Sequence, residues 1–146
     1  MDDYLKYWRV IRQYVKVKYG LTQSDLDVLM FIYTEKYFSK ARFDEFARIV
    51  SWDADRFKRL KEKGWIESFR KYDPHTNTRA IYQISPDGKR VVQSIYRMLK
   101  GEEMPIAPKY NPMFKGNAKY MSKVYRNSIR ELNAYLKQQQ QRPSPE

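Results

Sequence analysis

Arg56 and Arg59, two arginines three residues apart, are the residues whose type and spacing most clearly indicate binding to a partner. A guanidinium group can donate hydrogen bonds to the edge of a guanine or to a phosphate. Apolar Ala54, Phe57 and Leu60 recur at helical spacing, which places Arg59 on the opposite face of a helix and Arg56 at one side. The alternative is that these charges form a solvated helix surface. The candidate contacts in this segment are Ser51, Trp52, Asp55, Arg56, Arg59 and Lys63.

A second group of candidate contacts follows about ten residues later. Arg70, Lys71 and Arg79 flank a turn-rich tip that holds His75 and Asn77. An arginine on a protruding hairpin can enter a minor groove, where the negative potential of DNA is concentrated. The alternative is that these charges keep the edge of a hairpin soluble. We expect these five residues to bind DNA, with His75 exposed at the tip.

Catalytic and metal-binding arrangements are not expected in this sequence. It has no Cys and one His, so a Cys-based zinc site, a His-based metal site with Cys or a His-assisted triad with Cys cannot be assembled. No Gly-rich phosphate loop, nucleophile elbow or paired-carboxylate motif is present. We expect a protein that is not an enzyme and that needs no cofactor or metal.

The elements that must position these residues read as helix, turn, helix and hairpin. Apolar spacing predicts a helix over Phe43–Val50, and the basic helix that follows a turn ends at Gly64. Strand-like segments Ile66–Tyr72 and Arg79–Ile84 flank the turn residues Asp73–Thr78. A helix-turn-helix followed by a hairpin is a winged helix, which can place one helix in a major groove.

Flanking elements complete the predicted core. A helix from Asp2 to about Lys18 ends at Gly20, and Thr22 begins the next helix, with Asp25 placed as in a capping box. Ser39–Arg42 is predicted to be a short strand. Ser85 and Pro86 open a further helix as its cap and first residue.

The C-terminal third is predicted to be a connector and a long helix. Residues 100–116 are rich in Pro and Gly, while their Met104, Ile106, Met113 and Phe114 suggest that the segment lies along a surface. A helix over 117–141 presents an apolar stripe, and 142–146 read as a flexible tail. The residues of this stripe are Met121, Val124, Tyr125, Ser128, Leu132 and Leu136.

The composition of the chain limits the classes of protein to which it can belong. The chain has 146 residues, a formal net charge of +12 and a pI near 9.8, which favours a polyanionic partner. Neither a membrane-spanning run nor a signal peptide is found in the sequence, so we expect a cytoplasmic protein without membrane contact. Much of the positive excess lies in residues 1–20 and 100–146, outside the helix-turn-helix.

Three segments resemble the MarR family of winged-helix regulators. They are Leu21–Leu29, Arg56–Ile66 and Ile84–Lys89, which resemble the opening of that family's second helix, the end of its recognition helix and its exit from the wing. Arg79 is similar in place to the family's wing arginine. The resemblance implies a homodimer formed by the first and last helices, bound to duplex DNA. It does not identify a small-molecule effector.

The expected fold is therefore mainly α with a small β-hairpin wing. We expect a single winged-helix domain over 1–141, with a core at 21–99 and dimerisation helices at 1–20 and 117–141. The expected function is duplex-DNA binding, as a dimeric transcriptional regulator. The alternative is a winged-helix protein-interaction or assembly module of a viral or replication complex, which binds nucleic acid without sequence preference. The acidic start of the basic helix and the long connector favour this alternative.

Overall fold

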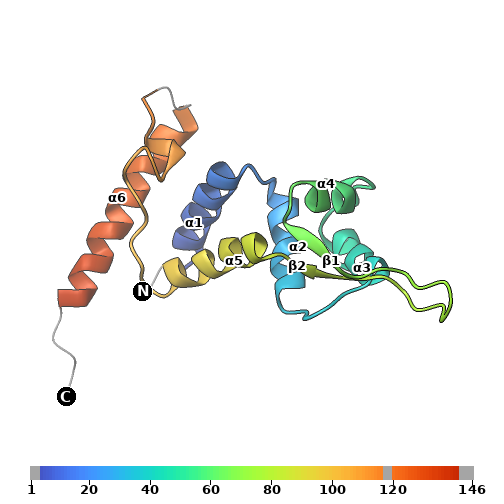
Figure 1. The fold of residues 1–146 in the computed structure, drawn as a ribbon. Helices are drawn as coiled ribbons and strands as arrows, with labels where there is room; N and C mark the ends of the chain where they lie inside the picture. The colour runs from blue at the N-terminus through green and yellow to red at the C-terminus, as the bar shows by residue number, and fades with distance from the viewer. Residues whose placement is uncertain (1–3, 117–119, 142–146) are drawn as a thin grey trace, which may run out of the picture. The chain divides into compact units, whose positions relative to one another are not determined.

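Six α-helices and one β-hairpin make up the part of the chain that this computed structural model describes, residues 4–116 and 120–141 (Figure 1). The predicted helix start at Asp2, the predicted start at 117 and the predicted tail 142–146 lie outside these residues. The elements are, in order, α1 (Tyr4–Tyr19), α2 (Gln23–Tyr33), α3 (Lys40–Val50), α4 (Arg56–Glu62), β1 (Ile66–Arg70), β2 (Ile81–Ile84), α5 (Pro86–Leu99), the short 3-10 helix η1 (Pro112–Phe114) and α6 (Tyr120–Gln141).

The chain divides into two compact units. Unit 1 comprises Met1–Gly20 and Ser94–Glu146, and unit 2 comprises Leu21–Gln93. The boundary falls inside α5, so the last residues of this helix belong with α1 and α6. The single domain with a core at 21–99 stays a prediction, and residues 94–99 of α5 group with the first and last helices in unit 1.

Unit 2 has helix starts set by single hydroxyl groups. Thr22 Oγ1 accepts a hydrogen bond from the Asp25 backbone N at 3.1 Å, which confirms the predicted start of α2. Ser39 Oγ accepts from the Arg42 backbone N at 3.1 Å and caps α3. The predicted strand at Ser39–Arg42 is therefore wrong, because Ser39 opens a helix. Before it, Phe38 alone forms a bridge to β2.

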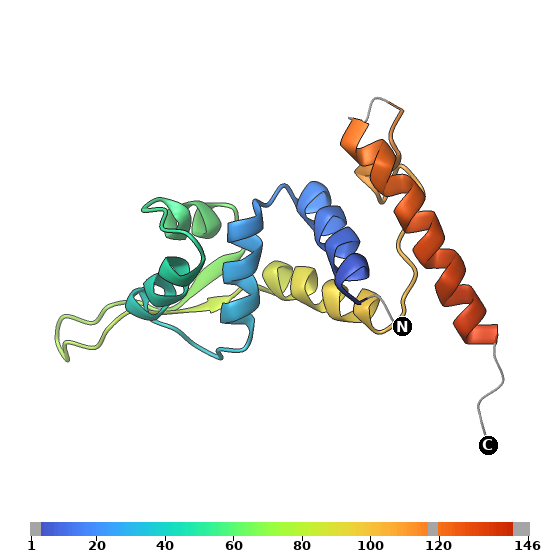
Figure 2. The same ribbon diagram turned by 180° about the vertical axis from the view of Figure 1, so that it is seen from behind.

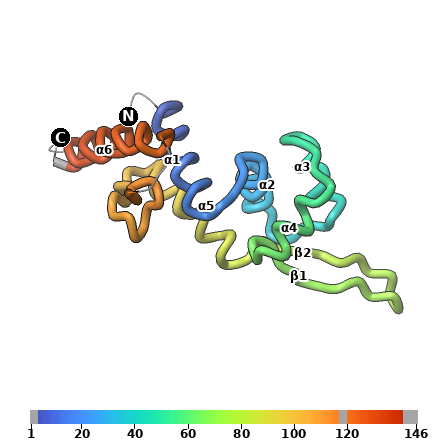
Figure 3. Tube along the Cα trace, turned by 90° about the horizontal axis from the view of Figure 1, so that it is seen from above, coloured from blue at the N-terminus to red at the C-terminus, as the bar shows by residue number. Residues whose placement is uncertain are grey.

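The hairpin of unit 2 is antiparallel, as predicted, and its strands are shorter than expected. Ile66 pairs with Ile84 and Ser68 with Tyr82, and the register becomes irregular before Arg70. The loop between the strands is closed by a bridge from Asp73 to Thr78. Figure 3 shows this loop running out beyond α3 and α4. The hairpin therefore presents its tip to solvent.

A shared apolar core joins the helices of unit 2 to its hairpin. Leu29 and Ile32 of α2, Phe43 of α3 and Leu60 of α4 are fully buried. Packing of α2 against both α3 and β2 encloses these side chains. A mainly helical unit with a small hairpin results, an arrangement compatible with a winged helix.

Unit 1 is held together by the connector as well as by its helices. Met104 and Met113 are buried, while Ile106 is exposed. Asn133 of α6 hydrogen-bonds to both the backbone N and O of Met104, at 2.9 and 2.8 Å. η1 packs against α1 and α6, and Figure 2 shows the connector beside α6. The connector is therefore an ordered part of unit 1.

Part of the predicted apolar stripes of α1 and α6 is exposed. On α6, Leu132 and Leu136 are buried with Ile129, which the predicted stripe did not include. Met121 and Val124 of that stripe are exposed, as is Leu5 of α1. Within the described residues, no helix is both long and apolar enough to cross a membrane.

Candidate nucleic-acid interface

Helix α4 is fixed at both ends by local hydrogen bonds. Before its first residue, Asp53 Oδ1 accepts a hydrogen bond from the Asp55 backbone N at 2.9 Å. At its end, Gly64 has a φ of +82°, and the Trp65 backbone N donates to the Leu60 carbonyl at 2.9 Å. A residue with positive φ together with this hydrogen bond forms a Schellman cap, and glycine is favoured at the position of positive φ. The sequence signal at Gly64 is confirmed.

Arg56 is buried and paired with an acid of α2. Its Nε donates to Asp25 Oδ1 at 3.0 Å, and both residues expose 3% or less of their surface. Its Nη1 donates to the Ser51 carbonyl. A nucleic acid cannot reach a buried guanidinium, so the prediction of Arg56 as a DNA contact is wrong. The physical reason is that the charge of Asp25 needs a partner inside the unit.

Arg59 is held by the same carboxylate. Its Nε donates to Asp25 Oδ2 at 3.2 Å and its Nη2 to Asp25 Oδ1 at 2.7 Å, which uses the guanidinium edge that suits a bidentate partner. Nη2 also donates to Asp53 Oδ2 at 3.1 Å. The hydrogen bonds to Asp25 raise the pKa of Arg59. With 30% of its side chain exposed, Arg59 is at most partly available to a partner.

Lysines occupy the solvent-facing side of α4 and its end. Lys58, Lys61 and Lys63 are exposed, and Asp55 is exposed beside them. Lys58 Nζ lies 4.0 Å from Glu62 Oε1, a distance at which water competes with the pair. A lysine amine acts as a point charge towards phosphates and lacks the planar fork that reads a guanine edge. This surface therefore suits phosphate contacts better than base contacts.

The turn before α4 exposes an aromatic side chain. Ser51 and Trp52 are both exposed, and Trp52 keeps 55% of its surface accessible. The guanidinium carbon of Arg48, at the end of α3, lies 5.4 Å from the centre of the Trp52 ring. The two predicted contacts in this turn are accessible, and Arg48 is a cation that the prediction did not include.

All five hairpin candidates lie on the surface. Arg70, Lys71, His75, Asn77 and Arg79 are exposed, as expected for His75 in particular. Arg70 Nη2 donates to the Arg79 carbonyl at 3.1 Å, which links the two strands next to the loop. The structure thus brings Arg70 and Arg79 together, while Arg56 is separated from the exposed set by burial.

An exposed aromatic pair at the loop end of β1 was missed in the sequence. The rings of Tyr37 and Phe69 stack with centroids 4.2 Å apart, and Phe69 keeps 51% of its surface exposed. Alternation along β1 could have revealed Phe69, because Ile66 is buried and a residue three positions later lies on the opposite face. Tyr37 lies in a loop without a periodic signal.

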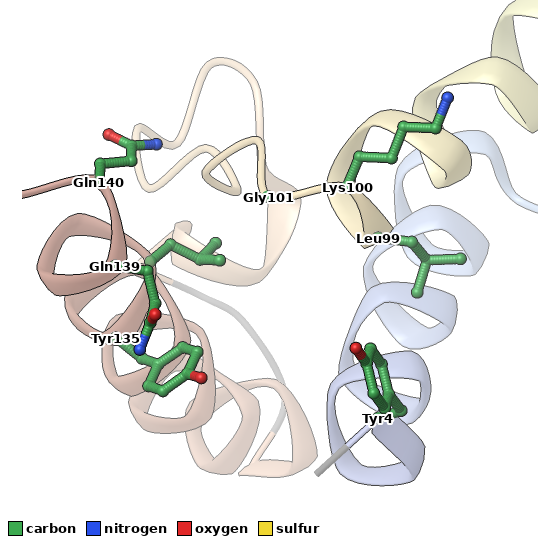
Figure 4. Close-up of a pocket in the computed structure, with 8 residues that line it drawn as sticks. Tyr4, Leu99, Lys100, Gly101, Tyr135, Gln139 and Gln140 are labelled. Carbon is green, nitrogen blue, oxygen red and sulfur yellow. The ribbon is translucent and has the colours of Figure 1, made fainter. Parts of the chain in front are cut away.

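A hollow of about 340 Å³ in unit 1 has the size of a ligand pocket. Tyr4 of α1, Leu99 at the end of α5 and Tyr135 of α6 line it, and Figure 4 shows the Lys100 amine directed away from Tyr135. Among the described residues that line the hollow, no cationic group therefore points inwards towards an anionic ligand. Within the described residues, no three His, Cys, Asp or Glu side chains are grouped as metal ligands.

Comparisons with known proteins add no relative. No protein-family model matches the chain, and neither a curated protein nor a solved structure matches it.

Proposed function

We propose that unit 2 is a winged helix that binds duplex DNA. In this arrangement α4 enters the major groove and the hairpin lies beside it. One observation supports the proposal most directly: α3, a turn and α4 are followed by an exposed hairpin, and the solvent side of both elements is basic. The exposed cations concerned are Lys58, Lys61, Lys63, Arg70, Lys71 and Arg79. The resemblance to MarR-family regulators remains a prediction that agrees with this order of elements.

We further propose a homodimer, which would present two such units to DNA. Its support is the apolar surface that unit 1 leaves exposed on α1 and α6. Leu5 is 83% exposed, and Tyr120 and Met121 are 80% and 61% exposed. Apolar patches of this kind mark interaction sites in soluble proteins. A two-fold dimer of this sort is how a transcriptional regulator would read a palindromic site.

A second candidate function is supported by the pairing of Arg56 and Arg59 with Asp25. Because Arg56 is buried and the partly exposed Arg59 is engaged by Asp25, the exposed cations that remain on α4 are lysines, and lysines favour phosphates over base edges. This favours a module that binds duplex DNA with little sequence preference, as part of an assembly. The two candidates share the surface and differ in sequence discrimination.

Selection of bound sites from random duplex DNA tests both candidates. A palindromic winner supports the dimeric regulator, and retention of duplexes without sequence enrichment supports the assembly module. If the six exposed cations each contact a phosphate, affinity should fall about a thousand-fold between about 50 and about 200 mM salt. Absence of duplex binding at the lower salt concentration would overturn the proposal.

A double variant and a matched control test whether α4 contacts the DNA. The double variant Lys58→Ala/Lys61→Ala should lower the slope of log affinity against log salt by about 2, one for each lost phosphate contact. The matched control is Lys36→Ala/Lys89→Ala, two exposed lysines of unit 2 outside the proposed surface. An equal effect of both double variants would mean that net charge, and not α4, governs the binding.

A further inference from the structure

Most of the net positive charge of this chain lies outside unit 2. Residues 1–20 and 94–146 contain fifteen Lys and Arg against six Asp and Glu, whereas residues 21–93 contain fourteen against eleven. The proposed binding of duplex DNA by unit 2 therefore does not account for the larger excess of positive charge, which lies in unit 1. Excess charge of one sign on one unit indicates a polyanion as its partner.

Within unit 1 the excess is concentrated in one uninterrupted stretch. Residues 104–130 contain no Asp or Glu. The basic residues of this stretch are Lys109, Lys115, Lys119, Lys123, Arg126 and Arg130. Aromatic side chains are interleaved with them, at Tyr110, Phe114, Tyr120 and Tyr125. The stretch covers most of the connector and the first half of α6.

Among the residues that the structure describes, the fold brings Lys115, Arg126 and Arg130 together around η1. Arg126 Nε donates to the Met113 carbonyl and its Nη2 to the Lys115 carbonyl, so α6 is attached directly to the connector. The guanidinium carbons of Arg126 and Arg130 lie 5.8 and 5.2 Å from the centre of the Phe114 ring. Lys123 lies one turn before Arg126 on the same side of α6. Because Met113 is fully buried, η1 is a fixed base for this cluster.

An exposed tyrosine, Tyr110, lies two residues before η1. Tyr110 keeps 54% of its surface accessible, and Lys109 Nζ lies 5.4 Å from the centre of its ring. The carbonyl of Tyr110 faces inwards, where it accepts a hydrogen bond from the Tyr14 hydroxyl at 3.5 Å. The backbone is therefore anchored while the ring remains accessible to a partner.

We propose that this surface, the connector patch, binds single-stranded nucleic acid. The connector patch consists of Lys109, Tyr110, Phe114, Lys115, Lys123, Arg126 and Arg130. An exposed ring among cations suits an unpaired base, which stacks on the ring while the cations contact the neighbouring phosphates. A duplex presents phosphates but no accessible base face, so it leaves Tyr110 without a role. An acidic protein likewise gives the ring no specific partner.

Binding of the full-length chain to a labelled oligothymidylate and to a random-sequence duplex, at the same salt concentration, tests the proposal. Tyr110→Ala should weaken oligothymidylate binding about ten-fold by removing one stacked base. Tyr110→Phe retains the ring and should restore the affinity. Lys115→Glu/Arg130→Glu should weaken oligothymidylate binding further and make it less dependent on salt. Binding of the duplex should change little in all three variants.

Two controls separate this site from the one proposed in unit 2. Lys36→Glu/Lys89→Glu makes the same change in net charge on exposed residues of unit 2 and should leave oligothymidylate binding nearly unchanged. Lys58→Ala/Lys61→Ala should weaken duplex binding alone. If Lys36→Glu/Lys89→Glu weakened oligothymidylate binding as much as Lys115→Glu/Arg130→Glu, bulk electrostatics would explain the binding and the connector patch would be overturned. If the patch variants lost only duplex binding, the patch would be a flanking duplex contact and the proposal would be wrong. A wild-type chain that does not bind oligothymidylate would overturn the proposal outright.

Discussion

Asp25 is a buried side chain that links α4 to α2. Its carboxylate accepts hydrogen bonds from Arg56 and Arg59, which lie 31 and 34 positions further along the chain. A buried ion pair is weak evidence for net stability, because desolvation of both partners offsets their attraction. Removal of one partner has a large effect, since it leaves a charge buried without compensation. The network thus ties α4 to α2 at one point.

We expect Asp25→Ala to lower the free energy of unfolding by about 3–5 kcal/mol, because Arg56 would remain buried without its acid. Urea denaturation followed by circular dichroism measures the change. The control is Asp87→Ala, which removes a pair of similar length, 2.7 Å to Arg90, with both side chains well exposed. Its cost should stay below about 1 kcal/mol. Comparable costs for the two variants would show that the buried pair has no special role.

Asp53 should give the folded protein a pH dependence in acid. The hydrogen bond from the Asp55 backbone N, supported by Arg59, lowers the pKa of Asp53. A depressed pKa stabilises the folded state above the unfolded value of about 3.9, and that contribution is lost as the pH falls through the lower folded value. Asp53→Asn keeps an oxygen acceptor for Asp55 and removes the titration. Urea midpoints measured between about pH 5 and about pH 2 should fall less steeply in the variant; parallel curves would contradict this.

At the scale of elements, the end of α4 depends on backbone conformation and not on space. A Cβ added at Gly64 would meet no atom within 4 Å, yet the φ of +82° strains any other residue. Gly64→Ala should therefore lower the free energy of unfolding by about 1–2 kcal/mol. Gly116→Ala is the control, since its Cβ also meets open space and its φ lies outside the left-handed range. Thermal unfolding in which the two variants are equally destabilised would show that the cap contributes little.

At the start of α5, by contrast, steric space and not backbone conformation requires a glycine, at Gly88. A Cβ at Gly88 would lie 2.5 Å from the Trp65 carbonyl oxygen and 2.7 Å from Ile84 Cγ1, at the base of the hairpin. Gly88→Ala must push α5 away from this backbone oxygen, and we expect a cost of about 1–3 kcal/mol. Hydrogen exchange should show weakened protection of the Ser85 and Lys89 amides. Full protection together with wild-type stability would mean that α5 shifts without resistance.

Local signals in the sequence were sufficient for most elements. Thr22, Gly64 and Ser85 act within three residues of the helix ends that they define, so their effect could be predicted without the fold. The Ser39–Arg42 strand was mispredicted because a serine can either end a strand or cap a helix. The pairing of Asp25 with Arg56 could not be predicted, because no periodicity relates side chains 31 positions apart. Helical spacing alone therefore presents Arg56 as a DNA contact, although it is buried.

For the whole molecule, we expect a homodimer at micromolar concentration. The apolar residues that α1 and α6 leave exposed would be covered in a dimer. Light scattering should give twice the chain mass of 17.8 kDa. Leu5→Glu/Val124→Glu places charges on both helices at exposed sites and should produce a monomer that is still folded. A wild-type mass of a single chain would contradict the dimer.

The shared carboxylate of Asp25 also has a consequence for divergence among sequences. Loss of the acid alone leaves Arg56 buried without compensation, and an apolar residue at 56 alone leaves the buried Asp25 with Arg59 as its remaining partner. Replacement of the whole set by apolar residues can be nearly neutral. Substitutions at positions 25 and 56 should therefore occur together, with position 59 following less strictly because Arg59 is partly solvated. Homologous sequences, when aligned, should show covariation between the first turns of α2 and α4. Such a correlated pair would report this contact without any coordinates.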